Sequence, residues 1–463
     1  MIKYISTRGG GTPQTFEQVL LTGLAPDGGL YVPENFPQIN LANLKGKSYQ
    51  DIAEIVMYPF VEGSISRVDF KKIINETYAS FRHGDITPLH HLKDNIYIME
   101  QFHGPTIAFK DVALQLLGRL FDHVLKKRSE RVTIVGATSG DTGSAAIEGC
   151  KSCDNIDIFI LHPKGRVSDV QRKQMTSVNA PNVHNIAIDG SFDDCQNMVK
   201  SMFNDKDFRQ NANLSAVNSI NWARIMAQIV YYFATAIKLG APDKEVSFIV
   251  PTGNFGNVFA AYCARKMGLP IKYLGISTNK NDILTRFFES GEMKVGAAYA
   301  TISPSMDIQI SSNFERYLFD LLGRDSEKLA NAMSEFRKSG SIKLSADLLE
   351  KANSEFTTSR ADDKQTLGLI KECYDETRYI LDPHTAVGMA GAKDVACKTS
   401  GAVVLLATAH PSKFPDAVEK AIGIRPDLPE HLSDLMTREE FMSEQPNDLN
   451  IVQDFVQKNS RAV

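Results

Sequence analysis

Lys110 is the residue of this chain whose position best suits covalent chemistry. It lies in the sequence Gly104-Pro-Thr-Ile-Ala-Phe-Lys-Asp111, and apolar residues recur at helical spacing over residues 109–124, so a long amphipathic helix is predicted to begin near Phe109. Lys110 lies off the apolar stripe and in the first turn, where the positive end of the helix dipole lowers the pKa of a lysine. An uncharged amine can form a Schiff base with a carbonyl compound. The alternative is a solvated lysine that pairs with Asp111 or another carboxylate.

A glycine-containing loop, Pro251-Thr-Gly-Asn-Phe-Gly-Asn257, joins a predicted strand to a predicted helix over residues 258–267. Its glycines allow successive backbone N–H groups to turn inward, and the helix start that follows attracts a phosphate. No lysine follows the loop and it contains only two glycines, so it is neither a P-loop nor the dinucleotide-binding fingerprint. The alternative is an ordinary strand-to-helix turn with Asn257 as the N-cap.

A second loop of this kind, at residues 137–143, carries Thr138, Ser139 and Asp141 at another predicted helix start. These side chains suit a carboxylate or a phosphate, or else they simply cap the turn. Both loops share one plan, in which a strand is followed by a hydroxyl residue, Gly, Asp or Asn, one further residue, Gly and a helix. Only this short core aligns, so we interpret it as a reused local device rather than a true repeat.

Two further segments offer groups that bind ligands. The sequence Asn218-Ser-Ile-Asn-Trp-Ala-Arg224 opens an apolar helix that runs to Lys238, and Asn218 with Arg224 is suited to bind an anion. The alternative is that Arg224 is a surface residue of the helix. Thr408 follows a predicted strand at residues 402–406. Its hydroxyl is placed either to bond a heterocycle nitrogen or to cap a turn.

The elements that position these residues follow a repeating pattern. From about residue 96, short β-branched runs each end in a loop that leads to an amphipathic helical segment, which predicts a mainly parallel, doubly wound α/β fold. Ligands of such folds bind at the carboxyl ends of the strands, where the loops described above lie. The predicted strands are residues 96–99, 132–135, 156–161, 183–188, 247–250, 271–276 and 402–406.

Composition narrows the class of protein further. With 463 residues, 43% hydrophobic and 23% charged, the chain is expected to be folded and globular. A net charge of −4 gives no basic footprint for nucleic acid or for an anionic membrane. The longest apolar stretch, residues 227–239, is too short to span a membrane, and the first residues have no apolar run of signal-peptide length.

The cysteines indicate a reducing compartment, because six irregularly spaced cysteines do not make a disulfide framework in a chain this long. We therefore expect a cytoplasmic protein. Cys150 and Cys153 have C-x-x-C spacing, but no second pair lies nearby to complete a zinc site, so we interpret them as structural and expect no metal.

Together, the lysine motif, the glycine loop and the sequence Ala407-Thr-Ala-His-Pro-Ser-Lys413 resemble those of pyridoxal-phosphate enzymes of the tryptophan-synthase-β fold type, also called fold type II. The lysine and glycine motifs alone would indicate only the cofactor. Other motifs resemble the threonine synthase family, in the longer branch typical of many bacteria and fungi. These are Tyr4-Ile-Ser-Thr-Arg-Gly9, Ala25-Pro-Asp-Gly-Gly-Leu-Tyr-Val-Pro33, Asn218-Ser-Ile-Asn-Trp-Ala-Arg224 and Ser303-Pro-Ser-Met-Asp-Ile308.

The resemblance implies a reaction in which O-phospho-L-homoserine and water give L-threonine and phosphate, the last step of L-threonine biosynthesis. It implies that Lys110 holds pyridoxal 5'-phosphate as a Schiff base and then moves protons on the substrate. Thr408 would face the pyridine nitrogen, and Thr138, Ser139 and Asp141 would lie near the substrate, with Asn218 and Arg224 near its phosphate. The phosphate of the cofactor would be held by Gly253, Asn254, Phe255, Gly256 and Asn257.

The resemblance also implies an arrangement in two αβ domains. Residues 96–110 and 208–463 would form a large cofactor-binding domain with a helical insertion at about 281–380, and residues 111–207 a small mobile domain. Residues 1–95 would form an N-terminal cap region. The oligomeric state stays open between monomer and homodimer.

Asp141 departs from the wider fold type, in which many relatives have asparagine at this position, next to the cofactor's ring oxygen. An ionised carboxylate would repel that oxygen, so Asp141 is expected to be protonated, turned away or used differently. His384, in Asp382-Pro-His-Thr-Ala-Val-Gly388, is interpreted as structural. Two alternatives remain at this level: a serine or threonine dehydratase, which needs no grip for a second phosphate, and a non-catalytic binder of a phosphorylated metabolite.

Overall fold

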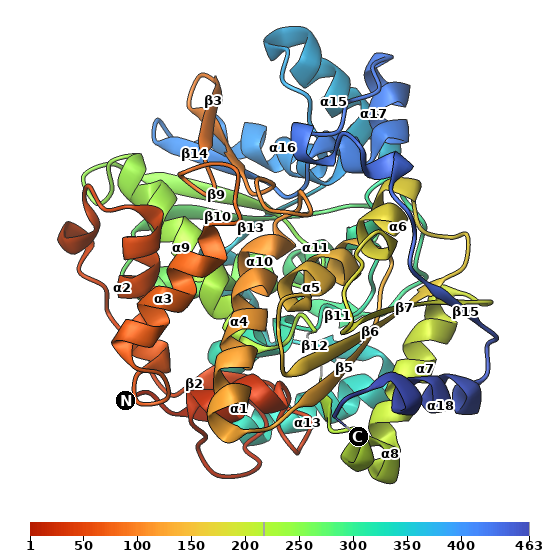
Figure 1. Ribbon diagram of the computed structural model, residues 1–463. Helices are drawn as coiled ribbons and strands as arrows, with labels where there is room; N and C mark the ends of the chain where they lie inside the picture. Colours follow the sequence, from red (N-terminus) through yellow and green to blue (C-terminus); the bar gives the residue numbers. More distant parts are fainter. Residues whose placement is uncertain (216–217, 463) are drawn as a thin grey trace.

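The computed structural model describes residues 1–215 and 218–462, which form two extended sheets covered by helices (Figure 1). In these residues the larger sheet has six strands in the order β13-β10-β9-β14-β4-β3. All neighbours are parallel except β3 and β4, which are antiparallel. The strands are β3 (Leu89–Lys93), β4 (Ile96–Glu100), β9 (Val246–Pro251), β10 (Ile271–Thr278), β13 (Thr357–Arg360) and β14 (Ala402–Ala407).

The smaller sheet is parallel throughout, and its described strands follow the order β15-β7-β6-β5-β8. They are β5 (Val132–Ala137), β6 (Ile156–Pro163), β7 (Val183–Ile188), β8 (Leu214–Ser215) and β15 (Ser443–Gln445). Every strand predicted from the sequence is present, and the mainly parallel α/β fold class is confirmed. Two antiparallel pairs stand apart from the sheets: β1 (Tyr4–Ser6) with β2 (Tyr31–Pro33), and β11 (Glu292–Lys294) with β12 (Ser341–Lys343).

Helices cover both faces of the larger sheet, because successive residues of its central strands point to opposite sides. In β9, Phe248 and Val250 belong to the main core cluster, whereas Ile249 belongs to a second cluster on the other face. Figure 1 shows α15 (Asp363–Thr377), α16 (Pro383–Ala396) and α17 (Pro415–Ile422) above this sheet, with α9 (Trp222–Lys238) and α10 (Gly256–Lys266) below it.

The remaining helices are α1 (Phe16–Thr22), α2 (Tyr49–Val61), α3 (Arg67–Tyr78), α4 (Lys110–Arg128), α5 (Asp141–Cys150), α6 (Asp169–Thr176), α7 (Phe192–Asn204), α8 (Lys206–Asn211), α11 (Ile283–Ser290), α12 (Phe314–Leu321), α13 (Ser326–Ser339), α14 (Ala346–Glu355) and α18 (Leu449–Asn459). Short 3₁₀ helices are η1 (Leu41–Leu44), η2 (Pro304–Met306), η3 (Pro411–Lys413), η4 (Glu430–Leu432) and η5 (Leu435–Thr437). In the part of the chain that the structure describes, no helix has the length and apolarity needed to cross a membrane.

The predicted helical insertion at 281–380 needs a correction. Its helices α11 to α15 are present, but β13 adds an edge strand to the larger sheet beside β10, and β11 pairs with β12. These strands are only three or four residues long, too short for alternation to reveal them in the sequence. The last residues also contribute to the fold, because β15 pairs with β7 and α18 packs on α7. The predicted domain boundaries remain a prediction.

The helix that carries Lys110 crosses α5 at very short range. A Cβ atom added to Gly118 would lie 2.1 Å from the carbonyl oxygen of Gly149, so neither helix tolerates a side chain at this crossing. Cys153 lies at the same contact, and its thiol donates to the carbonyls of Gly118 and Gly149 at 3.5 and 3.6 Å. Burial raises the pKa of this thiol to about 12, which fits the structural role predicted for Cys153.

Candidate active site

The loops singled out in the sequence all follow the carboxyl ends of parallel strands, where α/β folds bind ligands. Lys110 follows β4 through a nine-residue connection, and the loop that ends in Asp141 follows β5. The glycine loop follows β9, and Thr408 directly follows β14. The first, third and fourth of these strands belong to the larger sheet and β5 to the smaller one, so the site lies between the two sheets.

Lys110 is the first residue of α4, as predicted, and its side chain is only 11% exposed. Its Nζ donates to Oδ2 of Asp141 at 3.0 Å. Asp111 is engaged elsewhere, because its carboxylate accepts from the backbone N–H and the hydroxyl of Thr106 at 2.8 and 2.7 Å. Lys110 is therefore not a solvated lysine, although it does pair with a carboxylate other than Asp111, as the alternative interpretation allowed.

Burial lowers the pKa of Lys110, and the nearby positive charges of Lys413 and Arg224 lower it further. The carboxylate of Asp141 opposes both effects, but the net shift is downward. The direction agrees with the sequence prediction. Its largest cause is desolvation, which disfavours an ammonium group, rather than the helix dipole on which that prediction relied.

The backbone that carries Lys110 is joined directly to the end of β14. The N–H of Phe109 donates to the carbonyl of Thr408 at 2.8 Å, and the N–H of His410 donates to the carbonyl of Ile107 at 3.0 Å. Ile107 has a φ of 54°, a left-handed conformation that is strained for a β-branched residue. These bonds fix Lys110 and Thr408 relative to each other.

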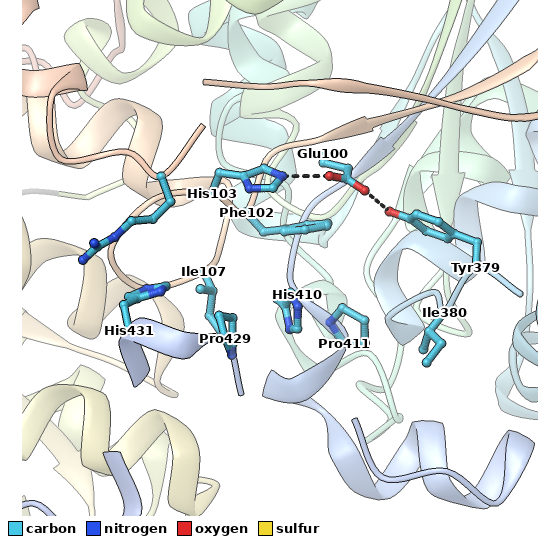
Figure 2. A pocket seen from close by; sticks show the side chains of 11 residues that line it. Glu100, Phe102, His103, Ile107, Tyr379, Ile380, His410, Pro411, Pro429 and His431 are labelled. Atoms are coloured by element: carbon cyan, nitrogen blue, oxygen red, sulfur yellow. Dashed lines mark hydrogen bonds and ion pairs between the residues drawn. The ribbon is translucent and has the colours of Figure 1, made fainter. Parts of the chain in front are cut away.

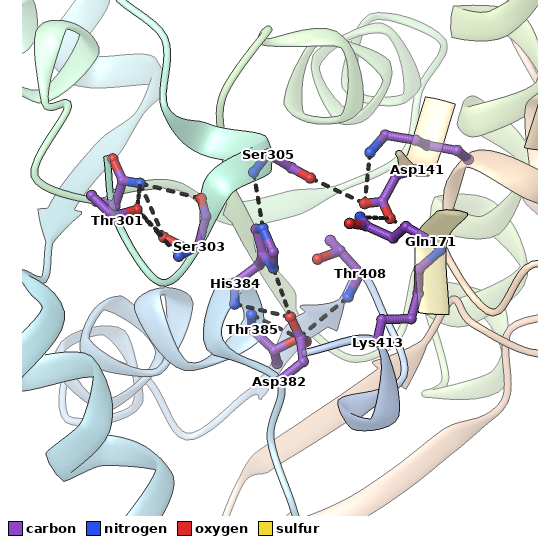
Figure 3. Close-up of polar contacts among 12 residues, drawn as sticks. Asp141, Gln171, Thr301, Ser303, Ser305, Asp382, His384, Thr385, Thr408 and Lys413 are labelled. Atoms are coloured by element: carbon purple, nitrogen blue, oxygen red, sulfur yellow. Dashed lines mark hydrogen bonds and ion pairs between the residues drawn. The ribbon is translucent and has the colours of Figure 1, made fainter. Parts of the chain in front are cut away.

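Each carboxylate oxygen of Asp141 has two polar partners (Figure 3). Its Oδ1 contacts Lys413 Nζ at 3.0 Å and Gln171 Nε2 at 2.8 Å, while its Oδ2 contacts Lys110 Nζ and Ser305 Oγ, each at 3.0 Å. The amide nitrogen of Gln171 and a lysine ammonium group only donate, so this arrangement fits an ionised carboxylate. Burial alone would raise the pKa of Asp141, but the charges of Lys110 and Lys413 hold it well below its usual range.

Asp141 is thus neither turned away nor protonated, which leaves the third of the expected possibilities. It is used as an anion that joins Lys110 to Lys413. The contacts of Lys413, Gln171 and Ser305 with Asp141 were not predicted from the sequence. Lys413 lies in a motif that was quoted for its resemblance, but a single lysine next to a proline-containing turn carries no periodic signal that it is buried.

His384 holds Ser305 in place. The backbone N–H of Ser305 donates to His384 Nε2 at 3.2 Å, so Nε2 is the accepting nitrogen and Nδ1 carries the proton that bonds Asp382 Oδ1 at 3.0 Å. This contact agrees with the structural role predicted for His384. The side chain still acts on the site, because Ser305 in turn donates to Asp141.

Thr408 is buried at the end of β14 and belongs to the same network (Figure 3). Its backbone N–H donates to the hydroxyl of Thr385 at 3.3 Å, and that hydroxyl donates to Asp382. Through Asp382, the strand end that carries Thr408 is connected to His384 and so to Asp141. One continuous chain of hydrogen bonds therefore connects Thr408, after β14, with Asp141, after β5.

The glycine loop enters α10 through Phe255, which has a φ of 63° and acts as the N-cap without a side-chain hydrogen bond. The alternative interpretation, in which Asn257 is the N-cap, is therefore wrong. Its side-chain oxygen accepts from Tyr232 at 2.7 Å and also from Tyr231, so it anchors the loop to α9 instead. Gly253 lies against the 303–306 turn, where an added Cβ would be 3.1 Å from the carbonyl oxygen of Ser305.

The backbone of this loop is suited to an anion. Among the described residues, no hydrogen bond uses the N–H groups of residues 253–257. Successive N–H groups at a helix N-terminus form a cradle for phosphate. A buried amine of lowered pKa lies near this cradle, linked to it through Asp141 and Ser305, so the residues present fit pyridoxal phosphate.

The predicted substrate residues differ in their surroundings. Thr138 is buried, and its hydroxyl accepts from the N–H groups of Gly140 and Gly143, both at 2.9 Å, so it caps the turn as the alternative interpretation held. Ser139 beside it is exposed, as is Asn218. Arg224 is 4% exposed rather than a surface residue, and burial lowers its pKa to about 10.

A separate cavity of about 370 Å³ lies beside the site (Figure 2). Its walls include Glu100, which accepts from Tyr379 at 2.8 Å and pairs with His103 at 2.7 Å. Of the residues described above it shares Ile107 and His410 but not Lys110 or Asp141. Burial lowers the pKa of His410 to about 4, so its imidazole is neutral at physiological pH.

Comparison with known proteins gives a consistent result along the chain. The family model "Threonine synthase N terminus" matches residues 3–78, "Pyridoxal-phosphate dependent enzyme" matches residues 81–340 and "Threonine synthase, C-terminal" matches residues 385–456. A curated threonine synthase from Pseudomonas aeruginosa is 55% identical over 462 residues, covering 99% of this chain and 98% of the relative.

Solved structures agree with these matches. The pyridoxal-phosphate-bound threonine synthase of Brucella melitensis superposes with a TM-score of 0.98 at 52% identity, covering 100% of both chains. The threonine synthase of yeast gives a TM-score of 0.94 at 40% identity, covering 99% of this chain and 98% of the yeast chain.

Proposed function

This chain belongs to the threonine synthase family of pyridoxal-phosphate-dependent enzymes, and from that premise we propose how its own residues carry out the reaction. The reaction is the conversion of O-phospho-L-homoserine and water to L-threonine and inorganic phosphate. The observation that carries the proposal is the buried amine of Lys110, which lies at a helix start beside an ionised carboxylate and near a cradle of backbone N–H groups.

Lys110 is the proposed catalytic residue. Its lowered pKa favours a neutral amine, which can both bind a carbonyl carbon and accept a proton. We propose that Nζ takes the proton from Cα of the substrate and returns protons to the substrate carbons at later stages. Asp141 Oδ2, 3.0 Å from Nζ, orients this nitrogen and stabilises its protonated form.

The cofactor is held by groups on three loops. Gly253, Asn254, Phe255, Gly256 and Asn257 are proposed to hold its phosphate through their backbone N–H groups, and Lys110 to hold its aldehyde carbon. When bound, pyridoxal phosphate supplies an electron sink for the negative charge that develops on the substrate carbons. Thr408 is proposed to face the ring nitrogen, where a neutral hydroxyl cannot keep that nitrogen protonated.

The charges of the site favour a phosphorylated substrate over an uncharged one. Lys413 and Arg224 bring positive charge and Asp141 brings one negative charge, so the cluster keeps a cationic excess even when Lys110 is neutral. We propose that Arg224 and Asn218 bind the substrate phosphate and that Thr138, Ser139 and Asp141 lie near its amino acid portion. Loss of that phosphate from Cγ and addition of water at Cβ then account for both products.

We further propose that the unit around residues 111–207 closes over the bound substrate, because water must be kept away while charge develops on carbon and then admitted at one position. A cytoplasmic location belongs to the same proposal. It is supported by the cysteines, which all lie in described residues and are free thiols.

The test is a comparison of substrates on one preparation of the purified protein. We expect O-phospho-L-homoserine to yield phosphate and L-threonine in equal amounts, and L-serine or L-threonine alone to yield no 2-oxo acid. Lys110→Ala should abolish product formation, whereas Lys364→Ala, at an exposed position, should leave it unchanged. Steady formation of 2-oxo acid from L-threonine, without turnover of the phosphorylated substrate, would show a dehydratase instead.

A further inference from the structure

Lys413 is a fully buried lysine with a defined set of partners. Its side chain is 0% exposed, and its Nζ contacts Asp141 Oδ1 at 3.0 Å and the carbonyl oxygen of Thr106 at 2.9 Å. A lysine in such a place is stable as a cation only if its charge is compensated. Asp141 supplies that compensation.

The carboxylate of Asp141 is divided between two lysines. Lys413 and Gln171 bind one oxygen, and Lys110 and Ser305 bind the other. The elements involved come from distant parts of the chain: Lys413 from η3, Lys110 from α4 and Gln171 from α6. Other charged or titratable groups also act on this cluster: Arg224 from α9 acts on Lys110, and His384 from α16 acts on Asp141. Asp111 from α4, whose carboxylate is bound by Thr106, interacts electrostatically with Lys413.

Lys110 and Lys413 have different roles in the proposed chemistry. Lys110 must lose and regain a proton and must bind carbon, so it cannot remain a constant cation. If Lys110 were the sole partner of Asp141, each loss of its charge would leave a buried carboxylate uncompensated. Within the described residues, Lys413 Nζ contacts Asp141 and the backbone of the loop that precedes Lys110, and neither contact draws it into the reaction.

We propose that Lys413 is a positioning residue, the permanent counter-cation that keeps Asp141 ionised and fixed beside Lys110 while Lys110 changes its protonation. This inference rests on the proposed function of Lys110. The Asp141–Lys413 pair as a whole is neutral, so it places no net charge beside Lys110.

The proposal is tested by single and double replacement in the full-length protein with bound pyridoxal phosphate. The readout is the pH midpoint of the visible absorption change that reports the proton on the nitrogen of Lys110. Lys413→Met removes a neighbouring positive charge and should move the midpoint to higher pH, by about one unit or more. Asp141→Asn removes the negative charge and should move it to lower pH.

The double variant Asp141→Asn/Lys413→Met exchanges the ion pair for neutral groups of similar size and should return the midpoint to the wild-type value. If Lys413→Met does not fold, the double variant still decides the question, since a midpoint displaced by about one unit would overturn the proposal. The matched control is Lys173→Met, because Lys173 is also nearly buried and binds a carboxylate and a backbone carbonyl, at Glu440 and Arg438. It should leave the midpoint unchanged.

A folded Lys413→Met variant with the wild-type midpoint would also overturn the inference, and the role of Lys110 would survive that result. A wild-type protein that shows no absorbing species with pyridoxal phosphate, or one that forms it on a different lysine, would instead contradict the proposed function itself. The two failures are therefore distinguishable.

Discussion

At the scale of single residues, the site is governed by how buried charges are paired. Lys110, Asp141 and Lys413 lie almost without solvent contact, so each charge depends on the next. A buried carboxylate between two lysines is stable, whereas removal of one partner leaves an uncompensated charge. This explains why the pKa of Asp141 is held low although burial alone would raise it.

Replacement of Arg224 by alanine tests whether this residue binds the substrate phosphate. We expect Arg224→Ala to lower kcat/KM for O-phospho-L-homoserine by about 100-fold, the size of a lost hydrogen bond to a charged group, with most of the change in KM. The matched control is Arg337→Ala, because Arg337 is exposed on α13. Steady-state kinetics, on variants shown to be folded by their melting temperatures, give the answer. An unchanged KM would show that Arg224 does not bind the phosphate.

The lowered pKa of His410 predicts that the protein loses stability in acid. Burial lowers its pKa to about 4, below the value of about 6.5 for an exposed histidine, so between these two values the unfolded chain binds the extra proton. The contribution of neutral His410 to the free energy of unfolding is therefore fully present above pH ~6.5 and is lost as the pH drops toward 4. His410→Asn, which can keep the cap on Ser412, should remove about 2 kcal/mol of the loss between pH 7 and pH 5.

Urea unfolding of the wild type and of His410→Asn at both pH values measures this difference. The same pH dependence in both proteins would show that His410 is not the group responsible.

At the scale of elements, the sequence predicted the helices and strands with strong periodic signals. Every β-branched run from residue 96 onward became a strand, and the helix expected near Phe109 begins at Lys110. The strands of the two extended sheets that were missed, β3, β8, β13 and β15, are two to five residues long and lie at the edges of these sheets. Pairing at a sheet edge depends on the neighbouring strand, which local sequence does not specify.

The same limit applies to the site. Lys110 and the glycine loop were found because each begins a helix in a recognisable local pattern. Lys413, Gln171 and Ser305 were not found, because their roles arise only when η3, α6 and the turn at η2 meet around Asp141. Asn257, the N-cap in the alternative interpretation of the loop, does not cap α10, because its side chain is bound by Tyr231 and Tyr232 of α9.

A substitution at Gly253 tests whether its loop holds the cofactor phosphate. Gly253→Ala would place a Cβ 3.1 Å from the backbone oxygen of Ser305, so the loop or the turn at η2 must move. We expect the dissociation constant for pyridoxal phosphate to rise by about tenfold, the cost of a small backbone shift in a fitted site. Absorbance titration of the apoprotein measures it.

The control is Gly368→Ala in α15, where an added Cβ has no atom within 4 Å. This substitution should leave cofactor binding unchanged and raise stability slightly, because alanine is the better helix former. Equal cofactor affinity of Gly253→Ala and the wild type would contradict the role of the loop.

At the scale of the whole molecule, the site exists only where the two sheets meet. Asp141 follows a strand of the smaller sheet, while Lys110 and Lys413 follow strands of the larger one, so the relative position of the sheets determines whether the charges meet. A change in that position therefore opens or assembles the site.

This geometry predicts closure on ligand binding. Crystal structures with and without a non-hydrolysable phosphonate analogue of O-phospho-L-homoserine should differ in the angle between the two sheets, with residues 111–207 moving toward the larger sheet. Identical angles in the two structures would contradict closure of this unit.

The central claim is that Lys110 is the amine that binds pyridoxal phosphate. Its most direct test is reduction of the coloured protein with borohydride, followed by identification of the modified peptide by mass spectrometry. Lys413 is the alternative attachment site to consider, because its amine and that of Lys110 contact the same carboxylate. The account predicts a pyridoxyl group on Lys110 alone; a label on Lys413, or on any other lysine, would contradict it.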